Sequence, residues 1–204
     1  GLQEAGVAAC AKHFPGHGAT SQDSHHVLPR VEADAELLHR RELLPFRAAV
    51  RAGVRSILTA HIEMPGLGGE GPATLAPHLL YDLLREQLGF TGVVVSDAIE
   101  MQGVSGRIGI PEACVRAVVA GVDLLCLGRF VYADQVALVR AALVEAVHEG
   151  RLPLRRLEEA ASRNAELRTW IRESAALRKG TLESEGVGLA GARRAVRVEG
   201  DLPS

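Results

Sequence analysis

Short apolar runs alternate along this chain with loops and with longer segments in which apolar residues recur at helical spacing. The third run, GVVVS, is a continuous β-branched stretch, which is typical of a strand buried on both faces of a parallel sheet. Alternating strands and helices with short connections predict a parallel sheet with helices outside it. The predicted strands are Val7–Lys12, Arg55–His61, Gly92–Ser96 and Val122–Leu127.

A segment of helical periodicity follows each predicted strand, and the last strand is followed by two. Pro45 should kink or split the first helix, because proline removes a backbone donor and clashes with the preceding turn. Trp170 has helical spacing in the last helix, so we expect it in the core. The predicted helices are Ala35–Ala52, Pro77–Leu88, Pro111–Ala120, Ala133–Glu149 and Pro153–Leu177.

Chemically active side chains gather where the predicted strands end. The loop after the first strand, Ala11–Pro29, reads AKHFPGHGATSQDSHHVLP and holds four histidines among glycine and proline breaks. His61 ends the second strand, and Asp97 follows the third. In parallel α/β folds the functional groups collect at the carboxyl ends of the strands. The pattern therefore predicts a site at this end of the sheet.

Composition narrows the class of protein. The chain has 204 residues, 47% of them hydrophobic, and a net charge of −2, which indicates a soluble globular protein with one main core. Nothing in this balance favours a nucleic acid or a membrane as partner. Cys10, Cys114 and Cys126 lie in apolar runs, so we expect buried thiols and a reducing, cytoplasmic compartment.

Two motifs carry a family resemblance. The first is KHFPGHG followed by DSH and LP, and the second is LLREQLGFTGVVVSD (83–97). Both resemble the signatures of glycoside hydrolase family 3, and more closely those of its bacterial β-N-acetylhexosaminidase (β-N-acetylglucosaminidase) branch. LTAHIEMPGL and PATLAP resemble the stretch between them, and the likeness covers Gly1–Ile171.

The resemblance implies a (β/α)₈ TIM barrel, which needs about 200 residues or more. Four βα units make half of one, so the expectation is the C-terminal half of the barrel, a fragment of a longer protein. Residues 1–178 would be a partial TIM-barrel catalytic domain. Residues 179–204 would be a linker and the start of a further domain. A half barrel exposes strand edges and an apolar inner face, which favours self-association.

The resemblance also implies roles for individual residues. Asp97 would be the catalytic nucleophile, forming a covalent glycosyl-enzyme. His25, oriented by Asp23, would be the general acid/base, which requires the loop to bend back and to move when substrate binds. Lys12 and His13 would bind sugar hydroxyls. Neither a metal nor an organic cofactor is implied.

The implied substrate is a carbohydrate with a terminal β-linked N-acetylglucosamine, for example a sugar derived from muropeptides. Glu100 departs from the family pattern, in which a small or short polar residue is more usual after the nucleophile.

Three other interpretations stay open. His13 and His17 have the spacing of a zinc-binding helix, although Pro15 and Gly16 break the helix that such a motif requires. The chain could be a catalytically incompetent remnant that only binds. A phosphorolytic variant of the same site is also compatible with the sequence, since a neutral histidine repels an incoming phosphate less than a glutamate does.

Overall fold

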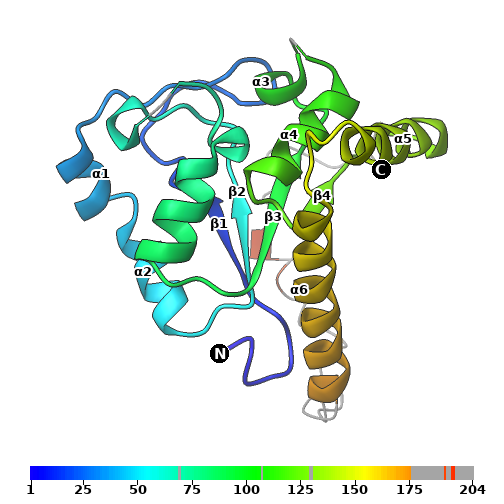
Figure 1. Ribbon diagram of the computed structural model, residues 1–204. Helices are drawn as coiled ribbons and strands as arrows, with labels where there is room; N and C mark the ends of the chain where they lie inside the picture. The colour runs from blue at the N-terminus through cyan, green and yellow to red at the C-terminus, as the bar shows by residue number, and fades with distance from the viewer. Residues whose placement is uncertain (69, 107, 129–130, 176–190, 192–193, 196–204) are drawn as a thin grey trace, which may run out of the picture.

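Four parallel strands form one sheet, in the order β1-β2-β3-β4, in the computed structural model of the chain (Figure 1). The structure describes residues 1–68, 70–106, 108–128, 131–175, 191 and 194–195. Each strand lies beside its neighbour in sequence, as the predicted alternation requires. The strands are β1 (Cys10–Phe14), β2 (Ser56–Thr59), β3 (Val93–Ala98) and β4 (Leu124–Cys126).

Every predicted helical segment contains a helix, with changes at the ends. The first one is split as expected, because Pro45 stands in the first turn of the second piece, where its missing N–H costs nothing. The helices are α1 (Ala35–Arg40), α2 (Leu44–Arg51), η1 (Pro65–Leu67), η2 (Ala73–Leu75), η3 (His78–Gln87, a π-helix), α3 (Gln102–Ser105), α4 (Ile110–Ala120), α5 (Ala133–His148) and α6 (Leu154–Glu173).

Several sequence predictions need correction. β1 lies three residues later than its apolar run, because pairing with β2 begins at Cys10 and the polar residues Lys12 and His13 stay extended. Cys10 is exposed on this edge strand, against expectation, and Cys126 is only half-buried. Trp170 is half-buried rather than in the core, with the guanidinium of Arg55 4.7 Å from its ring centroid.

Helices cover one face of the sheet far better than the other. Ile57 and Val94 point into the main core and are fully buried there. The opposite face carries a row made by Leu58, Val95 and Leu124, which pair across β2, β3 and β4. Leu58 and Val95 are only half-buried, and Leu124 is 45% exposed. This face is therefore apolar and incompletely covered within the described residues.

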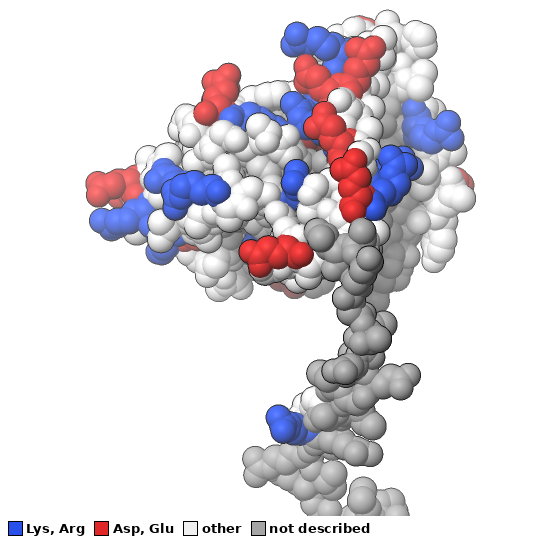
Figure 2. Space-filling model, turned by 90° about the horizontal axis from the view of Figure 1, so that it is seen from below, with Lys and Arg blue, Asp and Glu red and all other residues white. Residues whose placement is uncertain are grey.

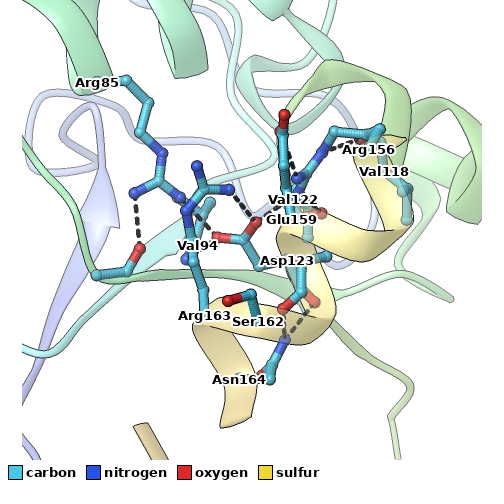
Figure 3. Close-up of polar contacts among 12 residues, drawn as sticks. Arg85, Val94, Val118, Val122, Asp123, Arg156, Glu159, Ser162, Arg163 and Asn164 are labelled. Carbon is cyan, nitrogen blue, oxygen red and sulfur yellow. Dashed lines mark hydrogen bonds and ion pairs between the residues drawn. The ribbon is translucent and has the colours of Figure 1, made fainter. Parts of the chain in front are cut away.

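Helix α6 is fixed to the sheet by a charge cluster around Asp123, next to β4 (Figure 3). The Asp123 carboxylate is fully buried and accepts bonds from Arg85 (2.6 Å), Arg163 (3.0 Å), Arg156 and the backbone N–H of Val94 (2.9 Å). The pKa of Arg85 is lowered to about 10, mainly by burial and also by the neighbouring arginines, against the opposing effect of Asp123.

On the face seen in Figure 2, acidic and basic side chains are mixed rather than gathered into a patch of one sign. No helix among the described residues is long and apolar enough to cross a bilayer. The part predicted as linker, 179–204, lies outside the described residues except for 191, 194 and 195.

Candidate active site

Asp97 stands near the carboxyl end of β3, one residue before the strand ends. Its Oδ1 accepts a hydrogen bond from the backbone N–H of Ala98 at 2.8 Å, which fixes one carboxylate oxygen. The side chain is 28% exposed, and its Oδ2 lies 3.8 Å from His13 Nε2. A carboxylate at the end of a buried strand, with one oxygen held and one open, can be kept at attack distance from a substrate carbon.

Lys12 and His13 lie at the end of β1, two strands away from Asp97. The peptide bonds Lys12–His13 and Phe14–Pro15 are cis. Burial lowers the pKa of His13, and the nearby Lys12 and His17 lower it further, whereas Asp97 acts in the opposite direction. The His13 ring is therefore neutral at neutral pH and can donate one hydrogen bond and accept another.

Asp23 and His25 form a hydrogen-bonded pair on the loop after β1. Asp23 Oδ1 lies 2.7 Å from His25 Nδ1 and also accepts the backbone N–H of His25 at 2.9 Å. The backbone folds back at this point, because the N–H groups of His26 and Val27 donate to the Asp23 carbonyl. These bonds from His25 hold the pKa of Asp23 below its usual range. The carboxylate thus stays ionised and keeps a proton on Nδ1, which leaves Nε2 free for acid/base chemistry.

A cleft of about 430 Å³ brings these groups together. All five residues singled out from the sequence line it, although they come from two strands and one loop. His17 also faces this cleft, with its ring edge-on to that of His13 at 6.2 Å between centroids, while His26 is exposed outside it. The lining residues are Lys12, His13, His17, Gly18, Asp23, Ser24, His25 and Asp97.

The histidine loop packs against the segment that follows β3. Ser24 is buried, whereas its neighbours Asp23 and His25 are exposed. A Cβ on Gly103 would lie 2.9 Å from the carbonyl oxygen of Val27 and 3.1 Å from that of Ser24, so only glycine allows this close approach. α3 lies beneath the loop at the upper end of the sheet (Figure 1).

His61, which the sequence left without a definite role, lies buried beside β3. It is 1% exposed, and its Nε2 lies 3.0 Å from the carbonyl oxygen of Ala98. Its Nδ1 lies 2.8 Å from Oγ1 of Thr74, which in turn lies 2.9 Å from Oγ1 of Thr59. Position at a strand end was the one sequence signal for His61, and nothing in the sequence marked Thr74.

Glu100, the departure from the family pattern, holds the chain after β4. Its Oε2 accepts the backbone N–H of Gly128 at 2.8 Å, and a Cβ on Gly128 would overlap its carboxylate. Among the described residues, no three His, Cys, Asp or Glu side chains are grouped so that they could hold a metal ion.

Comparison with known proteins agrees with this geometry. Residues 1–167 match the glycosyl hydrolase family 3 N-terminal domain. The chain belongs to glycoside hydrolase family 3. Among family members, it is 35% identical over 192 residues to β-hexosaminidase A of Pseudoalteromonas piscicida, covering 86% of this chain and 32% of that protein. It is 40% identical over 124 residues to a β-hexosaminidase of Thiobacillus denitrificans, and the match covers 61% of this chain and 34% of that protein.

A solved structure shows the same fold. The family 3 β-N-acetylglucosaminidase from Paenibacillus sp. str. FPU-7 superimposes with a TM-score of 0.79 at 40% identity, over 88% of this chain and 33% of that one. The chain therefore spans about a third of the length of these family 3 relatives.

Proposed function

We propose that the protein containing this chain is a retaining glycosidase that removes terminal β-linked N-acetylglucosamine. The observation that carries this proposal is the convergence on one cleft of a strand-end carboxylate, Asp97, and an oriented His–Asp pair, His25 with Asp23. Hexosaminidases among the relatives support the choice of sugar.

In the first step, Asp97 attacks the anomeric carbon of the bound sugar, and the bond from that carbon to the leaving oxygen breaks. Protonated His25 gives its Nε2 proton to the leaving oxygen, so the aglycone departs neutral. The product is a covalent glycosyl-enzyme with inverted configuration at the anomeric carbon.

In the second step, water attacks the same carbon, the bond to Asp97 breaks, and His25 Nε2 takes the proton from the water. Two inversions give net retention. Asp23 holds the imidazole in the orientation that both steps need and stabilises its charged form. Lys12 and His13 would bind hydroxyls of the sugar next to the scissile bond, since both line the cleft.

The four-stranded sheet would be the C-terminal half of a (β/α)₈ barrel, with residues 1–178 as the catalytic part and 179–204 as a linker to a further domain. The apolar row on its open face supports this, because closing a barrel would bury that face.

The test uses the protein as its gene encodes it, with these 204 residues in place. Release of p-nitrophenol from the β-N-acetylglucosaminide and from the β-glucoside is measured for the wild type, for Asp97→Ala, and for Asp82→Ala as a control, since Asp82 is exposed on η3 away from the cleft.

The expected result is turnover of the N-acetyl sugar alone, lost in Asp97→Ala and kept in Asp82→Ala. Preference for the glucoside would contradict the substrate. Absence of turnover in the folded wild type would contradict the proposed activity and favour the interpretation that the protein is a remnant that only binds. Glycosyl phosphate as the product in phosphate buffer would indicate phosphorolysis.

A further inference from the structure

We propose that His61 is a positioning residue for the glycosidase reaction, which holds the nucleophile in place through the backbone of Ala98. The inference rests on the proposed function, because it takes Asp97 as the nucleophile. It concerns a side chain that does not line the cleft, so its effect on the chemistry must pass through another residue.

The hydrogen bonds define which nitrogen of His61 carries the proton. A carbonyl oxygen can only accept, so the 3.0 Å contact with Ala98 requires a proton on Nε2. Burial lowers the pKa of His61, although the charges of Asp97 and Glu100 oppose this effect. A neutral ring with its proton on Nε2 has a lone pair on Nδ1, which accepts the hydroxyl proton of Thr74 at 2.8 Å, a proton that Thr74 shares with the carbonyl oxygen of Ala60 at 3.0 Å. Thr59 can then donate to Thr74 Oγ1 at 2.9 Å.

Both polar groups of the Ala98 backbone are thereby engaged at the nucleophile. Its N–H donates to Asp97 Oδ1, and its carbonyl accepts from His61 Nε2 and, at 3.1 Å, from the backbone N–H of Met101. The two groups belong to successive peptide planes that meet at the Cα of Ala98, so holding both restricts the torsions through which the backbone beside Asp97 can shift. Small displacements of reacting groups in such a region have large effects on rate.

His61 also lies under the support of the histidine loop. Its Cβ is 3.5 Å from the position that a Cβ on Gly103 would take, and the carbonyls of Ser24 and Val27 pass over the same glycine. One buried imidazole thus packs between the segment that carries the nucleophile and the segment that supports the acid/base pair.

Three variants of the protein as its gene encodes it test the inference. His61→Phe keeps a planar ring but removes both nitrogens, His61→Gln keeps a donor at about the position of Nε2, and Thr74→Val removes the hydroxyl at constant shape. His26→Phe is the matched control, because His26 is exposed. The readouts are kcat and KM with p-nitrophenyl N-acetylglucosaminide, and the rate at which a slowly released fluorinated sugar forms the covalent adduct, measured by mass.

For His61→Phe we expect kcat and the adduct rate to fall about a hundredfold with KM nearly unchanged, as for a displacement of about 1 Å at the nucleophile. In Thr74→Val, kcat and the adduct rate should fall roughly tenfold, which is the lower end of the loss expected when a supporting partner is removed. His61→Gln should recover most of the rate, and His26→Phe should match the wild type.

An adduct rate in folded His61→Phe within threefold of the wild type would overturn the inference. If His61→Phe does not fold, the adduct rate of Thr74→Val decides instead, and a rate equal to that of the wild type would overturn the inference. An inactive wild type would instead reject the proposed function, and the role of His61 with it, so the two failures are distinguishable.

Discussion

At the scale of single residues, the proposed nucleophile and the proposed acid/base group are held in different ways. Asp97 is held by a strand and half-buried, whereas His25 is 70% exposed on a loop and is held by Asp23. A nucleophile needs a fixed position, and an acid/base group must reach first the leaving oxygen and then a water molecule. The two kinds of support fit these two tasks.

The proposed role of His25 as proton donor predicts how strongly its removal lowers the rate for different leaving groups. In His25→Ala, kcat/KM for p-nitrophenyl N-acetylglucosaminide should change little, because p-nitrophenolate leaves without protonation. For the disaccharide of β-linked N-acetylglucosamine it should fall roughly 10²–10⁴-fold, the usual contribution of a general acid. Initial rates with both substrates provide the measurement.

Azide should also raise kcat of His25→Ala with the nitrophenyl substrate, because it needs no general base to attack the glycosyl-enzyme. His26→Ala, a neighbouring exposed histidine, should behave as the wild type. An equal loss on both substrates would argue against His25 as the proton donor.

The family motifs were sufficient to single out five of the eight residues that line the cleft, and the predicted strand ends marked three of these five as well. The residues that support these side chains were not visible in the sequence. Gly103 is needed because the carbonyl oxygens of residues 24 and 27 lie about 3 Å from the place that a Cβ would take, an approach that exists only after the chain has folded. Thr74 matters because its hydroxyl meets a histidine thirteen residues earlier in sequence.

At the scale of elements, α6 is attached to the sheet mainly through charge. Asp123 and Arg156 are almost completely buried, and Arg163 and Arg156 both come from α6. Asn164 of the same helix donates to the Asp123 backbone carbonyl at 2.8 Å. The cluster therefore links the amino end of β4 to a helix that starts about thirty residues later.

Asp123→Asn should destabilise the fold strongly. It leaves buried guanidinium groups without their counter-charge, a change that typically costs about 3–5 kcal/mol. The midpoint of urea unfolding, followed by circular dichroism, measures it. Glu112→Gln is the control, because Glu112 and Arg116 form an exposed pair on α4, which should contribute less than about 1 kcal/mol. Equal midpoints for the two variants would contradict a stabilising role for the cluster.

Element order and strand direction followed from the alternation of periods in the sequence, whereas element boundaries did not. β1 and β3 end two residues later than the predicted strands, at Phe14 and Ala98, because site residues continue the extended backbone. The π-helical form of η3 had no signal in the spacing of its leucines.

At the scale of the whole molecule, the sheet has helices on one face and an open apolar row on the other. Leu58, Val95 and Leu124 form that row across three strands. Apolar surface of this kind favours association when nothing else covers it.

The 204-residue chain prepared by itself should therefore self-associate in analytical ultracentrifugation. Leu124→Ser, at the most exposed position of the row, should shift the distribution towards the monomer. Leu138→Ser, on the outer side of α5 and also exposed, is the matched control and should have a smaller effect. A monomeric wild-type chain would contradict the prediction.

The place of β1 at the edge of the sheet links chemistry to assembly. Within the described residues, β1 pairs with β2 alone, and its end carries Lys12 and His13. A strand that added to the free edge would restrict those two residues, and a sugar bound to them would restrict the same strand. By thermodynamic reciprocity, pairing at this edge would change the affinity for the sugar by the same factor by which the sugar changes the pairing. With Lys12 and His13 in the proposed role, sugar affinity would also measure how completely this edge of the sheet is paired.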